Sequence, residues 1–392
     1  MRILIVHNRY RMHSGEDSAV DSLTALLKDR GNQVVTYMRH SDETDRYAFG
    51  EKLRFPLRTL WNSVAAREIS GLVRREKPDI AHIHNVFPLL SPCVYRALHR
   101  TGVAMVQTIH NFRLLCPGGL LWTNGAPCEL CKRGAVIHAI ARRCYRESYI
   151  FSALYALTVA VHRAAGTFAM IDRFIALTDF SATKLVESGL TAANKISVLG
   201  NFLPDPLPDV GPYNERQASV VFVGRLSREK GLPVLIEAVS GLPELRLKIM
   251  GDGPQRCELE RLAARTGATN VEFLGFLTGE DKWSVLRSSM ASVLPSVCYE
   301  NFPVALLESL AVGTPAVVSD IGALPYLIEN GKTGLTFKSH DVQDLQDKLR
   351  HLISAPNEAV RMGQCGRILV DMRFSAAAHY EALMKIYEDT RQ

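Results

Sequence analysis

The feature that most constrains the fold is an alternation of short apolar segments with amphipathic helical segments, which runs along the chain twice. Continuous apolar runs are typical of parallel strands buried on both faces, and the helical segments between them predict crossover connections. Strands are predicted at 2–7, 33–37, 79–84, 103–109, 173–177 and 195–199, and again at 219–223, 245–250, 270–274, 291–296, 316–319 and 334–337. The alternation predicts an α/β protein with two doubly wound, Rossmann-like domains that face each other across a cleft.

A proline-rich stretch without apolar periodicity separates the two alternations and is typical of an interdomain linker. We predict a first domain at 1–204 with a cysteine-rich loop at 111–144, a linker at 205–217, and a second domain at 218–370. The segment 371–392 is predicted to be a C-terminal helix that crosses back to the first domain.

The charge is unevenly distributed between the halves. Residues 1–204 hold 26 Lys and Arg against 16 Asp and Glu, whereas residues 205–392 hold 20 against 24. Much of the basic excess lies at 46–77, where apolar residues are interleaved with it, as in an amphipathic helix that lies on an anionic membrane. A solvated helix face is the alternative. No nucleic-acid partner is expected.

The amino-terminal residues predict a strand rather than a secretory signal, and no segment has the roughly 18 uninterrupted apolar residues of a membrane span. We therefore expect a cytoplasmic protein, peripheral at most to the inner face of the membrane. In that compartment its eight cysteines are not expected to form disulfides.

Two carboxylates mark a helix in the second half. Glu300 precedes a predicted helix at 304–312, whose start is formed by Asn301, Phe302, Pro303 and Val304, and Glu308 follows within it. Proline suits the first helical turn, and the free N–H groups of a helix start bind anions. The pattern predicts two carboxylates holding the ends of a ligand with a phosphate in its middle. An ordinary helix with solvated glutamates is the alternative.

Glycine-bounded loops follow two other strands of the second half. Gly224 and Arg225 begin a loop that ends with Lys230 and Gly231, and these cations could neutralise a diphosphate. Gly251 and Gly253 form a turn after the next predicted strand. Because ligands bind beyond the carboxyl ends of parallel strands, all three loops are expected at one site.

The first half offers weaker signals. His110 follows a predicted buried strand, where ligands bind, although it could simply pack or cap. Gly15 and Glu16 precede a helix predicted at 18–30, so Gly15 either approaches a phosphate or serves as a turn glycine.

Four cysteines lie in or directly after the long loop, with eleven, two and twelve residues between them: Cys116, Cys128, Cys131 and Cys144. A Cys-x-x-Cys pair can supply two ligands of a structural zinc ion, which the outer cysteines would complete. Four unligated thiols, or one redox pair, are the alternatives.

These motifs together resemble those of the retaining glycosyltransferases of the family-four type, glycosyl transferases group 1, which have the GT-B fold. Glu300 and Glu308 match the family's E-x₇-E signature, and the segments 224–231, 251–254 and 308–317 resemble its phosphate loop, its G-x-G-P turn and the segment that follows the second glutamate. The resemblance covers nearly the whole chain and is most specific in the second half. In the first half Ser14 stands where the family often has glycine.

The resemblance implies a role for each matching residue. Arg225 and Lys230 would hold the diphosphate of a nucleotide-sugar donor, Glu308 its ribose, and Glu300 the donor sugar. His110 would lie beside sugar and acceptor, and Gly15 would approach the phosphate. No cofactor would be needed at the diphosphate. The expected function is retaining hexosyl transfer from a UDP- or GDP-sugar to a glycan or lipid-linked acceptor in surface polysaccharide or glycolipid assembly. The alternatives are a nucleotide-sugar epimerase or hydrolase of this fold and a non-catalytic binding subunit.

Overall fold

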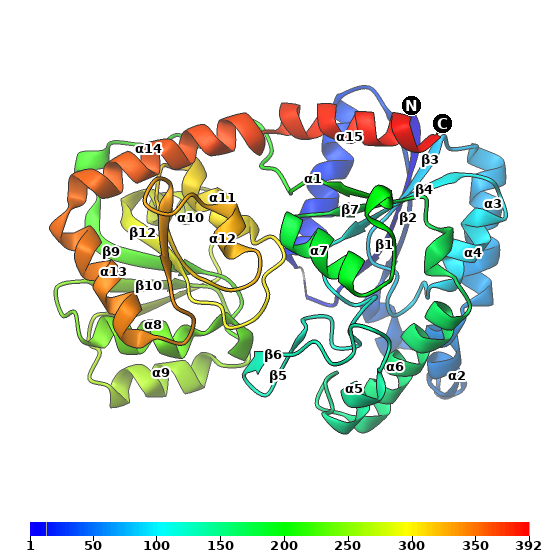
Figure 1. The fold of residues 1–392 in the computed structure, drawn as a ribbon, viewed down its shortest axis with the longest axis horizontal. Coiled ribbons are helices and arrows are strands. Elements are labelled where there is room, and N and C mark those ends of the chain that lie inside the picture. The colour runs from blue at the N-terminus through cyan, green and yellow to red at the C-terminus, as the bar shows by residue number, and fades with distance from the viewer. Residues whose placement is uncertain (13, 392) are drawn as a thin grey trace. The chain divides into compact units, whose positions relative to one another are not determined.

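The computed structural model describes residues 1–12 and 14–391 (Figure 1). The chain divides into two compact units, which are described separately. Unit 1 comprises residues 1–123 and 128–201 together with the chain from His379 onward, and unit 2 comprises residues 124–127 and 202–378. Gln392, the last residue of the predicted C-terminal segment, lies outside the described residues.

Unit 1 contains a six-stranded parallel sheet in the order β2-β1-β3-β4-β7-β8. Residues Ile3 to Val6 of the central strand β1 are fully buried, because helices cover both faces of the sheet. The strands are β1 (Arg2–Arg9), β2 (Gln33–His40), β3 (Ile80–Ile83), β4 (Ala104–Ile109), β7 (Arg173–Ala176) and β8 (Ile196–Val198). The helices are α1 (Gly15–Asp29), α2 (Phe49–Leu60), α3 (Ser63–Glu76), α4 (Cys93–His99), α5 (Ile137–Ala141), α6 (Tyr149–Ala164) and α7 (Asp179–Glu187).

Unit 2 repeats this architecture with the strand order β11-β10-β9-β12-β13-β14, again with parallel pairing. Alternate residues of β9 enter different cores, since Val220 and Phe222 pack in one cluster and Val221 in another. The strands are β9 (Gln217–Val223), β10 (Arg246–Met250), β11 (Val271–Gly275), β12 (Ser289–Leu294), β13 (Ala316–Ser319) and β14 (Gly334–Phe337). The helices are α8 (Leu232–Ser240), α9 (Arg256–Arg265), α10 (Gly279–Ser288), α11 (Val304–Ala311), α12 (Leu324–Leu327), α13 (Val342–Ser354) and α14 (Pro356–Arg373).

The chain ends in α15 (Ala376–Arg391), whose residues from His379 onward belong to unit 1. The hydroxyl of Tyr387 on this helix lies 2.6 Å from Nδ1 of His82 on β3, and both side chains are buried. The last helix is therefore part of the core of unit 1.

The structure corrects two local expectations. The helix predicted at 18–30 begins at Gly15, because Ser14 caps it and forms a reciprocal capping box with Asp17. The basic region 46–77 forms two helices, α2 and α3, because Asn62 starts a new helix by accepting hydrogen bonds from the N–H groups of Val64 and Ala65.

Candidate active site

Three loops of unit 2 converge at the carboxyl ends of β9, β10 and β12. The Leu226 N–H donates to the carbonyl of Asp252 at 3.0 Å, and the Leu226 carbonyl accepts from the Gln255 N–H at 3.0 Å. The Val297 N–H donates to the carbonyl of Glu229 at 2.9 Å. The loop that follows β9 is thus held from both sides, at the point where the strand order reverses and α/β sheets bind ligands.

Two glycines allow these loops to come so close. Gly251 has φ +138°, and a Cβ atom there would lie 1.8 Å from the carbonyl oxygen of Gly224. Gly231 has φ +68°, and a Cβ atom there would lie 1.9 Å from the carbonyl oxygen of Pro295. Both positions require glycine for two reasons: the positive φ angle and the close contact with a carbonyl oxygen.

Lys230 and Glu300, predicted to bind different parts of a ligand, form an ion pair with each other. Lys230 Nζ donates to Glu300 Oε1 at 2.6 Å, and the Ser296 hydroxyl donates to the same oxygen at 2.6 Å. Burial works to raise the pKa of Glu300, but the Lys230 cation and the two hydrogen bonds outweigh it and lower that pKa. Burial likewise works to lower the pKa of Lys230, but Glu300 raises it above its usual value. Both groups are therefore charged at neutral pH.

The second glutamate also has a cationic partner. Lys282 Nζ on α10 donates to Glu308 Oε1 at 2.7 Å, and the two side chains are 19% and 16% exposed. As predicted, Glu308 lies within α11 and Glu300 precedes it, because Asn301, Phe302 and the N-cap residue Pro303 come before the first helical residue, Val304. Arg225 is exposed on its loop.

In unit 1, Gly15 and Glu16 lie in the first turn of α1. Glu16 Oε2 accepts hydrogen bonds from the hydroxyl of Tyr10 at 2.8 Å and from Asn111 Nδ2 at 3.1 Å. Its neighbour Asp17 accepts from Nε2 of the fully buried His7 at 2.8 Å. These contacts join the start of α1 to the ends of β1 and β4.

The half-buried His110 belongs to a cluster with two buried histidines, His82 and His84. Its Nε2 lies 2.9 Å from Nδ1 of His84, whose ring stacks on that of His82 at a centroid distance of 4.3 Å. Burial lowers the pKa of all three imidazoles, that of His82 to about 3. His84 Nε2 is buried and has no hydrogen-bond partner among the described residues. At neutral pH the cluster is therefore uncharged.

Arg113 is a cation that the sequence analysis did not identify as a candidate site residue. The guanidinium of Arg113 lies 5.7 to 6.0 Å from the ring centroids of Tyr10, Phe87, Tyr145 and Tyr155, as in cation–π contacts. Its Nε is buried without a partner among the described residues. No local motif marks Arg113, because its partners come from distant parts of the sequence. Lys282, Ser296 and His84 were missed for the same reason.

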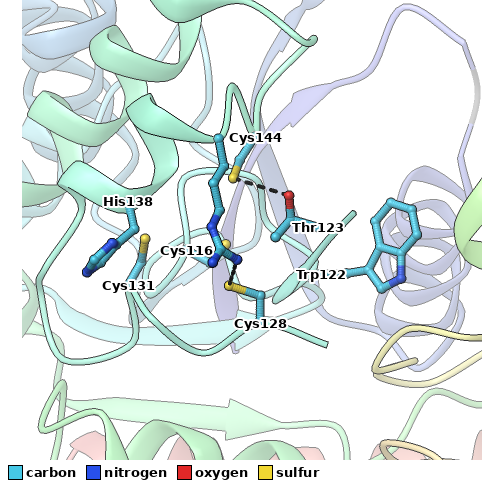
Figure 2. Close-up of a pocket in the computed structure, with 8 residues that line it drawn as sticks. Cys116, Trp122, Thr123, Cys128, Cys131, His138 and Cys144 are labelled. Atoms are coloured by element: carbon cyan, nitrogen blue, oxygen red, sulfur yellow. Dashed lines mark hydrogen bonds between the residues drawn. The ribbon is translucent and has the colours of Figure 1, made fainter. Parts of the chain in front are cut away.

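The four cysteines of the predicted zinc site line one small cavity in unit 1, together with His138, Arg142, Trp122 and Thr123 (Figure 2). Within residues 1–12 and 14–391, no group of three or more His, Cys, Asp and Glu side chains is arranged so that it could hold a metal ion as it stands. The structure thus brings the predicted ligands together without showing a closed site.

The chain matches two family models. "Glycosyltransferase Family 4" matches residues 15–204, and "Glycosyl transferases group 1" matches residues 207–368. The sulfoquinovosyl transferase SQD2 of Arabidopsis thaliana is 29% identical over 57% of this chain and 44% of its own length. A glycogen synthase of Mycobacterium tuberculosis is 28% identical over 94% of this chain and 84% of its own. The chain spans less than half the length of several of its curated relatives.

Among solved structures, HepE of Anabaena, crystallised in complex with UDP-glucose, aligns with a TM-score of 0.69 over 99% of this chain and 100% of its own. The two sequences are 16% identical, so this likeness bears on the fold. The expected fold is confirmed: two doubly wound α/β units of the GT-B class.

Proposed function

The chain belongs to the glycosyl transferases of group 1, family four, and on that premise we propose that it transfers a hexosyl residue from a nucleotide-sugar to a glycan or lipid-linked acceptor with retention of configuration. The observation that carries the proposal is the Lys230–Glu300 pair, held where the loops after β9 and β12 meet. A cation and a carboxylate, mostly buried beside glycine-rich loops, suit a ligand with a diphosphate next to sugar hydroxyls.

The pair suggests how donor binding begins. A diphosphate carries negative charge that competes with Glu300 for Lys230, and exposed Arg225 adds a second cation that can approach it. Once Lys230 turns to the phosphate, Glu300 can accept hydrogen bonds from the sugar. In the same way, Glu308 would release Lys282 and accept hydrogen bonds from the ribose hydroxyls. These side chains and the N–H groups at the start of α11 would take the role of a divalent metal at the leaving diphosphate.

A uridine or guanosine diphosphate sugar is the proposed donor. The complex of the similarly folded HepE with UDP-glucose supports the uridine form. The test is release of UDP, GDP or ADP from a panel of nucleotide-sugars, with and without lipid and glycan acceptors, in buffer without added divalent metal. We expect acceptor-dependent release that Mg²⁺ does not increase. Release without any acceptor would instead favour a hydrolase, and the absence of both release and calorimetric binding would rule out a transferase.

The acceptor side of the proposal rests on an amphipathic surface of unit 1. The helices α2 and α6 lie against each other (Figure 1), and both expose large apolar side chains. On α6, Ile150, Leu157 and Val161 are 78%, 52% and 39% exposed and form one stripe at helical spacing, beside exposed Phe49 and Leu57 on α2. We propose that this surface, with basic side chains around it, rests on the anionic inner face of a membrane, where a lipid-linked acceptor would be found.

None of the helices within the described residues is long and apolar enough to cross a membrane. Peripheral binding is tested by flotation with vesicles containing anionic phospholipid at low and high salt. We expect salt-sensitive flotation that is lost when Leu157 and Ile150 are replaced by Ser. The control is Ile368→Ser, which removes an apolar side chain 56% exposed on α14 in unit 2. Flotation unaffected by the α6 changes would contradict this surface.

A further inference from the structure

Four cysteines from well-separated positions line one cavity of unit 1. Cys116, Cys128, Cys131 and Cys144 all line it (Figure 2), and its volume is about 10 Å³. A space of that size holds roughly one water molecule, so it suits a single ion and excludes a substrate. Cys116 and Cys131 are 7% and 5% exposed, and the cavity lies within unit 1.

The segment that carries these cysteines has little regular structure of its own. Between Phe112 and Cys144 its regular elements are α5 and the two-residue strands β5 (Trp122–Thr123) and β6 (Ala126–Pro127). Two of the cysteines begin turns, since the Cys116 carbonyl accepts from Gly119 N–H at 2.8 Å and the Cys131 carbonyl from Gly134 N–H at 2.9 Å. Loops of this length with so few elements need a further constraint to stay ordered.

The sulfur atoms now make weak contacts with the protein. Arg142 Nη1 donates to Cys128 Sγ at 3.6 Å, and Cys144 Sγ donates to the Thr123 hydroxyl at 3.8 Å. Both contacts are long enough to be weak, so a metal ion could replace them. Arg142 would also balance charge. Four thiolates on a divalent ion leave a net negative charge, and the Arg142 guanidinium lies beside it.

We propose that Cys116, Cys128, Cys131 and Cys144 together bind one structural zinc ion. On binding, the four S–H bonds break, four Zn–S bonds form, and four protons pass to solvent, with no change in oxidation state. The ion fixes the loop that begins at Asn111 and Arg113, and so holds those two side chains against Tyr10.

The first test is the metal content of the purified full-length chain after dialysis. We expect about one equivalent of zinc per chain. Titration of this protein with an organomercurial should release the zinc as thiols react, which a metallochromic dye detects. All eight thiols should then be countable under denaturing conditions. Less than about half an equivalent of zinc, or fewer free thiols because of a disulfide, would overturn the proposal.

Substitutions identify the ligands. Replacing any of the four cysteines by Ser should lower zinc content below half an equivalent, whereas Cys257→Ser should keep it, since that thiol is exposed on α9 in unit 2. His138→Gln should also keep the zinc. Loss in His138→Gln together with retention in Cys144→Ser would refute the set of four sulfurs. Where a variant does not fold, the cobalt-substituted wild type decides, because thiolate ligation produces a charge-transfer band. These readouts are independent of sugar transfer.

Discussion

Both units hold polar groups at the end of a parallel sheet, but they do so by different means. In unit 2 the backbone does it: glycine loops contact one another directly, and the polar side chains are charged and paired, as in Lys230 and Glu300. In unit 1 side chains do it: the neutral imidazoles of His84 and His110 contact each other, and that of His82 contacts the last helix. A site built from backbone constraints leaves a sequence motif, whereas a site built from side-chain contacts does not.

The largest effect is expected where the charged pair of unit 2 is broken. Lys230→Ala or Glu300→Gln should lower turnover about 10³-fold, because each removes a group proposed to act on the diphosphate or the sugar. The double variant should be little worse than either single one, since the two residues act as a unit. Turnover is measured as nucleotide release at saturating donor.

The matched control is Lys332→Ala in the same unit, which removes an ion pair with Glu329 that is exposed and screened by solvent. Its turnover should equal that of the wild type. If Lys230→Ala kept wild-type turnover with an intact circular-dichroism spectrum, the proposed active site would be wrong.

A substitution at a glycine tests whether contacts between backbone loops hold the site of unit 2 together. Gly251→Ala should lower the free energy of unfolding by about 3 kcal/mol or more, because its Cβ would overlap the carbonyl of Gly224 in addition to straining φ. Gly267→Ala is the control, since Gly267 also has positive φ but nothing within 4 Å of the added atom. It should cost about 1 kcal/mol. Urea unfolding measures both, and equal costs would show that the loop contact is dispensable.

The two units should differ in their stability towards acid. Burial lowers the pKa of His82, His84 and His110, so the unfolded state binds more protons than the folded state once pH falls below about 6.5. Stability of unit 1 should therefore fall as pH decreases from about 6.5. The pKa of Glu300 in unit 2 is also lowered, and its contribution is lost only as pH falls below about 4.5.

Hydrogen exchange at pH 7 and pH 5.5, corrected for intrinsic rates, measures this difference. Amides of β1, β3 and β4 should lose protection at pH 5.5, while those of β9, β10 and β12 keep it. Equal losses in both units would mean that the histidine cluster does not set the acid sensitivity of unit 1.

The same contrast explains how much could be predicted from the sequence. The alternation of apolar runs with amphipathic helical segments was sufficient to predict both sheets. The spacing of the glycines was sufficient to predict the loops around Lys230 and Gly251. The pairing of Lys282 with Glu308 could not be predicted, because it depends on where α10 packs. The start of α1 was misplaced because the capping box of Ser14 with Asp17 was not recognised. The environments of His84 and Arg113 depend on residues far away in the sequence.

The smallest effect is expected from His84, which we place as a positioning residue behind His110. Its Nδ1 contacts His110 Nε2 at 2.9 Å, so His84→Gln should alter the orientation and proton affinity of His110 without removing it. Turnover should fall about 10-fold, and the acid limb of its pH profile should shift, whereas donor binding should not change. The control is His99→Gln, an exposed position at the end of α4, with an unchanged profile expected. A merely structural role would lower stability and leave the pH profile in place, and that outcome would remove His84 from the site and leave unit 1 with His110 alone.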